Sequence, residues 1–241
     1  MSPLKKKFLS AYPLLYISLR RVWHRFREIM ERHVIGTRFQ EWIWQTRHLY
    51  DYDLAGFSIS SVNHPHRDQI VNSITLFLPI SSILEVGCGW GANLLRLREQ
   101  FPNVDLHGVD INGKAITVVR EHFDRLGQKS VFLREGRANC LNFYADKSID
   151  VVLCDAVLMF LAPDKIRETL AEMGRVARNS IILNEYHLAG AMGGHYEGGR
   201  WVYDIINLYK ELYPNLKYTI TKSTYTGGNW DRFGTFIIIH L

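Results

Sequence analysis

The chain has 241 residues, of which 47% are hydrophobic and 22% are charged, and its formal net charge is +5. These values are typical of a globular chain with one sizeable α/β domain, and the sequence has no run of about 18 uncharged apolar residues that would predict a membrane-spanning helix. The three cysteines, Cys88, Cys140 and Cys154, have neither paired nor zinc-type spacing. We therefore expect free thiols, a reducing cytoplasm and no metal site.

The positive charge is concentrated near the N-terminus. Residues 1–50 hold ten Lys and Arg against three Glu, a net charge of +7, whereas the remaining residues carry a net charge of −2. This asymmetry does not indicate a basic domain that reads nucleic acid. Apolar residues recur at helical spacing from Leu15 to Ile29, which predicts an amphipathic helix that ends at Gly36. A second, aromatic-rich helix is expected over about 38–50, followed by a loop from 51 to 63.

Residues 1–62 are therefore predicted to form a basic helical extension, and residues 63–241 the main domain. Two roles for the extension are open. Residues 1–35 could lie on the anionic inner membrane surface. Alternatively, the two helices could cover a ligand cleft or form a homodimer. We favour the second role, because Glu28 and Glu31 dilute the charge that membrane binding needs.

The strongest motif spans residues 83–93. An apolar run around Glu85 predicts a buried strand, Gly87, Gly89 and Gly91 follow at alternate positions, and helical spacing begins again near Asn93. Glycines let a ligand approach the main chain, and the new helix presents unpaired N–H groups. The segment is thus suited to binding a polar or anionic ligand group.

Further strands and helices alternate after this motif. We expect strands at 104–111, 131–133, 149–154 and 180–184, with helices at about 91–100, 112–126 and 163–176. Asp110 ends the second strand and Asp155 follows the fourth. Ligands bind outside the carboxyl ends of strands in such open sheets, and a carboxylate there can accept hydrogen bonds from ribose hydroxyls.

The C-terminal part has a different pattern. Five glycines lie between Gly190 and Gly199, which predicts a mobile substrate lid, and a helix is expected over about 201–212. Strands at 217–225 and 234–241 are joined by a short glycine turn and must be antiparallel. The predicted fold is therefore a doubly wound, mostly parallel, seven-stranded α/β sheet with a C-terminal antiparallel hairpin.

The E-x-G-x-G-x-G motif from Glu85 to Gly91, together with Asp110, the strand at 149–154 and the C-terminal hairpin, resembles class I S-adenosylmethionine (SAM) dependent methyltransferases. The resemblance implies SAM as cofactor, with the glycine loop around its methionine and ribose. It implies a polar or basic group near His66 and Arg67, in a helix that we expect Asn63 to cap, for the methionine carboxylate. The expected cofactor-binding residues are Glu85, Gly87, Cys88, Gly89, Gly91, Asn93, Asp110, Ile111, Ala138, Asn139, Asp155 and Arg67.

One position departs from the family pattern. Arg137 stands where the family usually has an aspartate that binds the adenine amino group. Asn139 or a backbone group near Ala138 could replace that contact, or Arg137 could stack on the adenine ring.

Methyl transfer depends chiefly on positioning, and a general base helps when the acceptor is a hydroxyl. His187 is the first candidate for that base, followed by Glu185 and His195. The chain lacks the Asp/Asn-Pro-Pro-Tyr and Pro-Cys motifs of DNA methyltransferases, so we expect a small-molecule, glycan or lipid-linked acceptor and regard nucleic acid as unlikely. The alternatives are a scaffold on a decayed methyltransferase fold and an NAD(P)-dependent oxidoreductase, which the hairpin disfavours.

Overall fold

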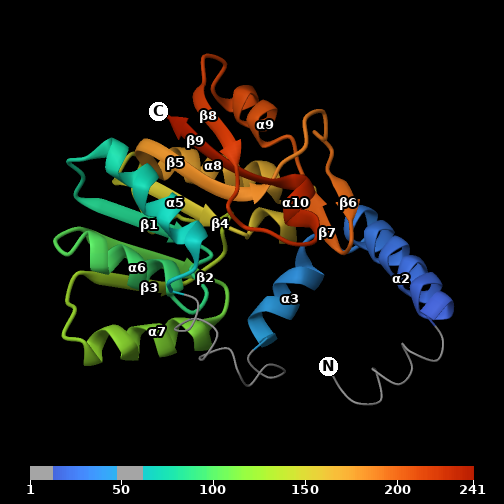
Figure 1. Ribbon diagram of the computed structural model, residues 1–241, viewed down its shortest axis with the longest axis horizontal. Helices are drawn as coiled ribbons and strands as arrows, with labels where there is room; N and C mark the ends of the chain where they lie inside the picture. The colour runs from blue at the N-terminus through green and yellow to red at the C-terminus, as the bar shows by residue number, and fades with distance from the viewer. Residues whose placement is uncertain (1–12, 48–61) are drawn as a thin grey trace.

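The computed structural model describes residues 13–47 and 62–241. Its centre is a seven-stranded sheet in the order β3-β2-β1-β4-β5-β9-β8 (Figure 1). The first five strands in this order are parallel, and β9 is antiparallel to both β5 and β8. This confirms the predicted fold class. The strands are β1 (Ser82–Val86), β2 (Asp105–Asp110), β3 (Val131–Glu135), β4 (Ile149–Asp155), β5 (Ala177–Tyr186), β8 (Lys217–Lys222) and β9 (Gly234–His240).

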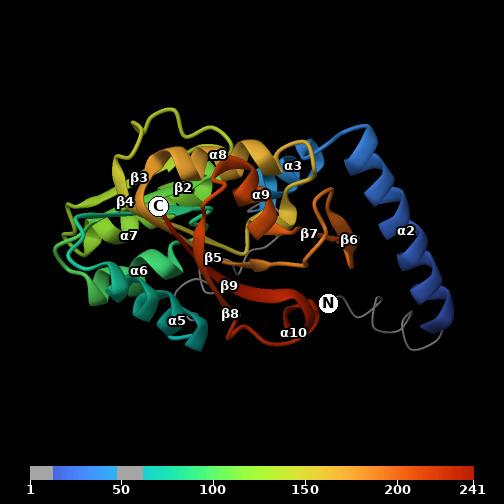
Figure 2. The ribbon, with the colours of Figure 1, turned by 90° about the horizontal axis from the view of Figure 1, so that it is seen from above.

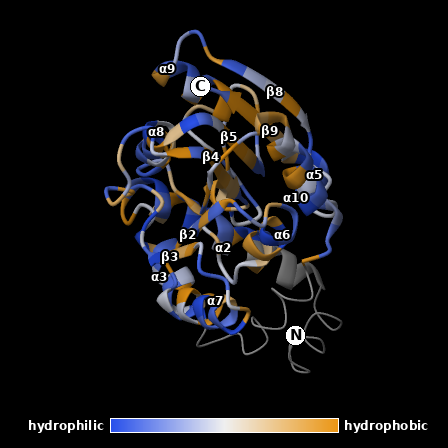
Figure 3. Cartoon of the chain, turned by 90° about the vertical axis from the view of Figure 1, so that its left-hand side faces the viewer, coloured by the Kyte–Doolittle hydropathy of each residue, from blue (hydrophilic) through white to orange (hydrophobic). Residues whose placement is uncertain are grey.

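Helices cover both faces of this sheet, as Figure 2 shows. One apolar layer packs against α5 (Pro65–Ile74), α6 (Ala92–Gln100) and α7 (Gly113–Arg125), and the other packs against α8 (Ile166–Val176) and α9 (Ile205–Leu212). Alternate residues of each strand enter opposite layers, because successive side chains point to opposite faces. In β1, for example, Ile83 joins the first layer and Leu84 the second. Figure 3 shows the resulting concentration of hydrophobic residues on the strands.

The strand order reverses direction at β1, which lies between β2 and β4. Chain connections leave the carboxyl ends of these neighbouring strands toward opposite faces of the sheet, so a crevice opens there. Short 3-10 turns, η2 (Thr75–Phe77) and η3 (Leu158–Phe160), complete the connections after α5 and β4.

The N-terminal part contains two helices, α2 (Pro13–His33) and α3 (Arg38–Thr46), separated by Gly36 with φ of +56°. The predicted loop at 51–61 lies outside the described residues. Helix α2 is amphipathic as predicted, but its polar side faces the domain. The buried Glu31 carboxylate accepts hydrogen bonds from Arg27 (2.6 Å), Gln40 (3.0 Å) and Trp201 (2.8 Å).

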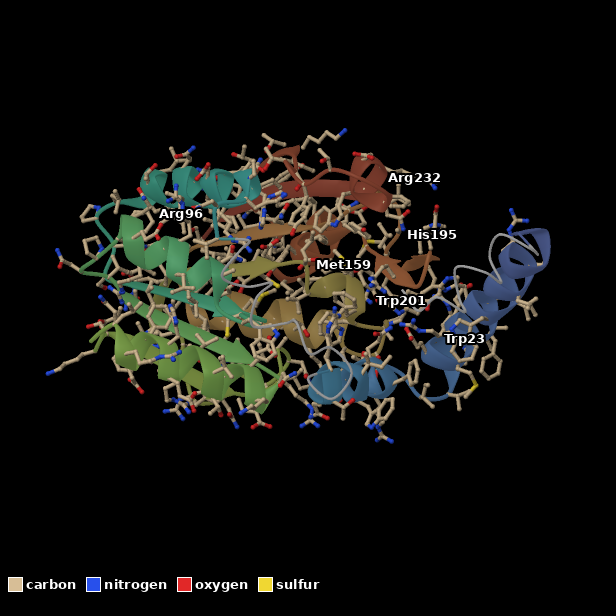
Figure 4. All side chains as sticks on the ribbon, turned by 60° about the horizontal axis from the view of Figure 1, so that its bottom comes forward. Trp23, Arg96, Met159, His195, Trp201 and Arg232 are labelled. Atoms are coloured by element: carbon tan, nitrogen blue, oxygen red, sulfur yellow. The ribbon has the colours of Figure 1, made fainter. Side chains whose placement is uncertain are left out.

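The apolar side of α2 is correspondingly exposed. Five of its side chains are between 48% and 67% accessible, namely Leu19, Val22, Trp23, Phe26 and Ile29. Figure 4 shows Trp23 on α2 at the edge of the molecule, apart from Trp201. Within the described part of the chain, no helix is both long and apolar enough to cross a bilayer.

Three local predictions were wrong. His64, not Asn63, is the N-cap of α5. The region around residue 200, predicted as loop and helix start, forms a hairpin of β6 (His195–Glu197) and β7 (Arg200–Val202). Its two-residue turn, Gly198-Gly199, has both φ angles positive, which this type of hairpin requires. Helix α9 therefore starts later, at Ile205, with Asp204 as its N-cap. A short helix, α10 (Asn229–Phe233), occupies part of the predicted glycine turn before β9.

Candidate active site

A cavity of about 550 Å³ lies at the carboxyl ends of β1, β2 and β4. This volume is within the usual range for small-molecule and cofactor sites. The glycine loop forms its floor, α3 supplies one wall, and the segments after β3 and β4 supply the others. Of the twelve expected cofactor-binding residues, all except Gly91 line this cavity.

The glycines of the loop have different structural tasks. A Cβ on Gly91 would lie 2.7 Å from Val119 Cγ1, so this glycine permits close packing of the loop on α7. A Cβ on Gly89, which lines the cavity, would meet no atom within 4 Å. Gly89 therefore leaves space where a ligand can approach the backbone, and its φ of +48° favours glycine.

Asp110 fixes this loop. One oxygen accepts the Gly89 N–H at 2.7 Å, and the other accepts the Asn112 N–H at 2.8 Å. Burial raises the pKa of the Asp110 carboxyl, while the two backbone hydrogen bonds oppose that shift. Each oxygen keeps a further lone pair, so the carboxylate can also accept hydrogen bonds from a diol in the cavity.

Asp155 is the centre of a second polar group. Its Oδ2 accepts a hydrogen bond from Asn93 Nδ2 at 2.9 Å and lies 3.2 Å from His66 Nε2, and its Oδ1 accepts one from Asn184 Nδ2 at 2.8 Å. Burial alone would raise the pKa of Asp155, but these hydrogen bonds and the charge of His66 outweigh it, so the pKa is lowered. The carboxylate therefore remains ionised at neutral pH.

Glu85 is different, although it is a near neighbour. It is only 2% exposed, and its Oε1 accepts a hydrogen bond from Asn93 Nδ2 at 2.7 Å. Among residues 13–47 and 62–241, its Oε2 has no hydrogen-bond partner, nor has Asn93 Oδ1. Burial raises the pKa of Glu85 to about 8, opposed by the Asn93 hydrogen bond and reinforced by the charge of Asp155. On these two cavity-lining side chains, Asn93 Oδ1 can accept a hydrogen bond from a ligand, and Glu85 Oε2 can do so once the carboxyl group releases its proton.

The start of α5 adds positive charge at the same end of the cavity. Arg67 is 6% exposed, lines the cavity, and its Nη1 contacts His66 Nε2. His64 and His66 both pack on the ring of Tyr225, with centroid distances of 4.8 and 4.2 Å. Tyr225 also lines the cavity, although the sequence offered no signal for it beyond its place at the end of a predicted strand.

Helix α3 forms the opposite wall. Trp44 lines the cavity, and its backbone carbonyl accepts a hydrogen bond from Asn112 Nδ2 at 3.0 Å. Its Nε1 is buried and has no hydrogen-bond partner in the part of the chain that the structure describes. Glu41 forms an ion pair with Arg137 at 3.2 Å, and Asn139 donates to Glu168 at 2.9 Å. Thus the residue that departs from the family pattern is paired with the N-terminal extension.

The three candidates for a general base are not brought to the cavity. Glu185 accepts hydrogen bonds from the backbone N–H groups of Val157 (2.6 Å) and Leu158 (3.0 Å), and burial raises its pKa to about 8. His187 Nδ1 accepts the Ile205 N–H at 3.1 Å, and burial lowers its pKa. His195 lies on the surface beside Glu197, at 3.0 Å, near the labelled Arg232 in Figure 4. These contacts anchor the strand end and the hairpin, and the catalytic role remains a prediction.

Comparison with known proteins shows that the central region is similar to methyltransferases. A family described as "Methyltransferase domain" matches residues 83–180. The human tRNA N(3)-cytidine methyltransferase METTL6 is 29% identical over 111 residues, which cover 44% of this chain and 39% of METTL6. Methyltransferase ungE' of Aspergillus campestris is 34% identical over 103 residues, which cover 41% of this chain and 30% of that protein. The matches thus span less than half the length of these curated relatives.

Solved structures share the fold over a longer range. SAM-bound CalS10, an amino pentose methyltransferase from Micromonospora echinaspora, has a TM-score of 0.55 at 16% identity, covering 74% of this chain and 91% of that one. A SAM-dependent methyltransferase from Aquifex aeolicus has a TM-score of 0.52 at 16% identity, covering 76% and 95%. The [4+2]-cyclase SpnF has a TM-score of 0.56 at 16% identity, covering 78% and 92%. Since one of these proteins is named as a cyclase, the fold alone does not establish the reaction.

The residues of the cavity fit SAM on the structure's own evidence. Gly89 leaves room at the backbone, the Asp110 carboxylate can accept from a diol, and Asn93 Oδ1 is an unsatisfied acceptor on a side chain bonded to the ionised Asp155. The strand order, the glycine loop and the match to a methyltransferase domain are consistent with that cofactor. Residues 83–180 thus match a methyltransferase domain, the chain has the fold of class I SAM-dependent methyltransferases, and the cavity fits SAM as cofactor.

Proposed function

We propose that this protein transfers a methyl group from SAM to an oxygen or nitrogen atom of a small-molecule, glycan or lipid-linked acceptor. The observation that carries the proposal is the cavity at the strand-order reversal, where the glycine loop, Asp110, Glu85 and Asp155 converge. A decayed fold would not be expected to keep these carboxylates buried at a ligand-sized cavity, since each is costly without a function.

Different residues of the cavity would bind different parts of SAM. Asp110 holds the Gly89 loop and can accept hydrogen bonds from the ribose hydroxyls. Asp155 and Glu85, linked through Asn93, provide negative charge for the ammonium group, and Arg67 provides positive charge for the carboxylate. When bound, SAM supplies an activated methyl group on a sulfonium. The protein's main contribution is then to hold the acceptor in line with that methyl group and to exclude water.

Nucleic acid is the second class of acceptor that has to be tested. METTL6 is named as a tRNA methyltransferase, so the sequence-based view that nucleic acid is unlikely has no support from that relative. We test the proposal with SAM labelled in its methyl group, offered with metabolite, glycan, lipid and total tRNA fractions. Label in any of the first three supports the proposal, and label in tRNA alone contradicts its acceptor class. A protein that binds SAM but labels nothing would favour the scaffold alternative.

We propose further that α2 contacts an anionic membrane surface at the cytoplasmic side. Its exposed apolar stripe, Leu19 to Ile29, is flanked by exposed Arg21 and by Arg25, whose side chain is 72% accessible. An outward apolar face with flanking arginines and a tryptophan is suited to the lipid interface. A second copy packed on the same stripe would bring these arginines close to their own counterparts.

Vesicle sedimentation tests this contact, with phosphatidylcholine alone and with added phosphatidylglycerol. We expect binding only to the anionic vesicles, reduced about tenfold by Phe26→Ser, because a buried Phe side chain is worth about 1.5–3 kcal/mol. Leu126→Ser is the matched control, since Leu126 is 54% exposed on a different helix end. Binding that is unchanged in Phe26→Ser, or a dimer in solution that the same substitution dissociates, would contradict the membrane role.

A further inference from the structure

The binding of SAM proposed above determines the order in which its parts lie along the sheet. Its methionine part is assigned to Glu85 and Asp155, on β1 and β4, and its ribose to Asp110, at the end of β2. The strand order is β3-β2-β1-β4, and the ribose of SAM is covalently placed between the methionine part and the base. The adenine base would therefore lie on the far side of Asp110, toward the end of β3.

The cavity continues in that direction, and α3 forms its opposite wall. Two contacts join α3 to the segments that follow β2 and β3. Asn112 Nδ2 donates to the backbone carbonyl of Trp44 at 3.0 Å, and Arg137 Nε lies 3.2 Å from Glu41 Oε1. We call this part the base end of the cavity, and its lining residues are Glu41, Trp44, Ile111, Asn112, Ala115, Gly136, Arg137, Ala138 and Asn139.

The amino group of adenine needs a hydrogen-bond acceptor, and few side chains of the base end can provide one. Asn112 Oδ1 already accepts two backbone N–H groups, both at 3.1 Å. The amide nitrogen of Asn139 donates to Glu168 at 2.9 Å, which leaves Asn139 with a neutral oxygen. Among the lining residues that the structure describes, Glu41 supplies the one carboxylate of the base end, and a charged acceptor makes the stronger hydrogen bond.

The ion pair with Arg137 orients the Glu41 carboxylate. The Glu41 side chain is only 16% exposed, whereas that of Arg137 is 54% exposed. An ion pair with such an exposed guanidinium adds little to stability, so its main effect is to restrict where the carboxylate lies. A carboxylate has about four lone-pair sites, and the single contact at Oε1 therefore leaves capacity for an N–H group of a ligand.

We propose that Glu41 accepts a hydrogen bond from the amino group of the adenine base, and that Arg137 positions its carboxylate. The proposal rests on the SAM-dependent function proposed above and adds the residue that selects the base. The acceptor for the amino group then comes from α3, across the cavity from Arg137, where the sequence departs from the family pattern. The N-terminal extension is thus part of the cofactor site and determines its specificity for adenine.

Calorimetric titration with two ligands tests this contact, namely S-adenosylhomocysteine and its analogue with hydrogen in place of the purine amino group. The wild type should bind S-adenosylhomocysteine about 10- to 150-fold more tightly than the analogue, because the analogue lacks the hydrogen bond to a charged group. In Glu41→Ala the two affinities should agree within about threefold, because the amino group has lost its partner. Glu41→Gln should keep a reduced preference, since it retains a neutral acceptor. A purely structural role of Glu41 would weaken both ligands equally and leave their ratio unchanged.

Arg137→Ala should narrow the preference without abolishing it, because the carboxylate remains but is less well oriented. Glu211→Ala is the matched control and should keep the wild-type preference, since Glu211 also pairs with an arginine, Arg167 at 3.1 Å, but does not line the cavity. A preference that is unchanged in Glu41→Ala, or lost instead in Asn139→Ala, would overturn the inference. Equal binding of both ligands to the wild type would overturn the inference alone, whereas binding of neither would contradict the proposed function as well.

Discussion

Replacing Glu85 by Gln tests whether this buried carboxyl group releases its proton when the cofactor binds. In the free protein, burial raises its pKa from 4.5 to about 8, so at pH 7 the group is roughly nine-tenths protonated. An ammonium group placed beside Asp155 and Glu85 would lower that pKa by about 1–3 units. The binding of S-adenosylhomocysteine at pH 7 should therefore release about 0.4–0.9 proton per molecule bound.

The assay is calorimetric titration in buffers with different ionisation enthalpies, which converts the released proton into a measurable heat. Wild type should show the buffer-dependent heat, and Glu85→Gln should not. The variant should also bind about 10- to 150-fold more weakly, since a hydrogen bond to a charged group is worth about 1.5–3 kcal/mol. Identical heats and affinities in the two proteins would refute the placement of the ligand's ammonium group at Glu85.

The same raised pKa has a consequence for stability in the absence of ligand. Because the folded state holds the Glu85 proton above the pH at which the unfolded chain loses it, the unfolding free energy falls as pH rises from about 4.5 to about 8. One such group contributes a slope of up to about 1.4 kcal/mol per pH unit in this window. Glu185 has a similarly raised pKa, so the test is the difference between wild type and Glu85→Gln. The variant should show the shallower slope in urea unfolding.

Four other substitutions test three separate parts of the structure. Glu31→Ala should speed tryptic cleavage within α2 about tenfold or more, because three hydrogen bonds to a buried carboxylate are lost. Glu28→Ala is the control and should change the cleavage rate little, because the Glu28 carboxylate is partly exposed. Gly89→Ala should weaken cofactor binding and cost about 1 kcal/mol of stability for its positive φ. Gly91→Ala should lower the melting temperature further, because it adds pressure of its Cβ on α7 to the same backbone strain. The reverse pattern would contradict the roles assigned to these glycines. His187→Ala should reduce kcat less than tenfold, since its Nδ1 already accepts a backbone N–H; a larger loss would assign it the role of base.

The central sheet could be predicted from the sequence because local patterns specify it. Fully buried strands such as β1 and β4 appear as short apolar runs, and the glycines after β1 identify the loop. The hairpin at Gly198-Gly199 could have been found from the same kind of signal, since two adjacent glycines suit its turn. It was missed because five glycines in a short span resemble a flexible loop.

The position of the N-terminal helices could not be predicted in this way. Helical periodicity identifies the two faces of α2 but not which one meets the protein. Here the buried Glu31 decides the orientation, because it accepts a hydrogen bond from Trp201, which is far away in the sequence. The contributions of Trp44 and Glu41 to the cavity likewise depend on tertiary contacts, with Asn112 and Arg137, that no sequence spacing encodes.

Calorimetric titration of the purified protein with S-adenosylhomocysteine tests the cofactor site most directly, with NAD as the comparison and Asp110→Ala as the control variant. We expect micromolar binding of S-adenosylhomocysteine, loss of that binding in Asp110→Ala, and no binding of NAD. Binding of NAD instead would indicate an oxidoreductase, and binding of neither ligand would contradict a functional cofactor site.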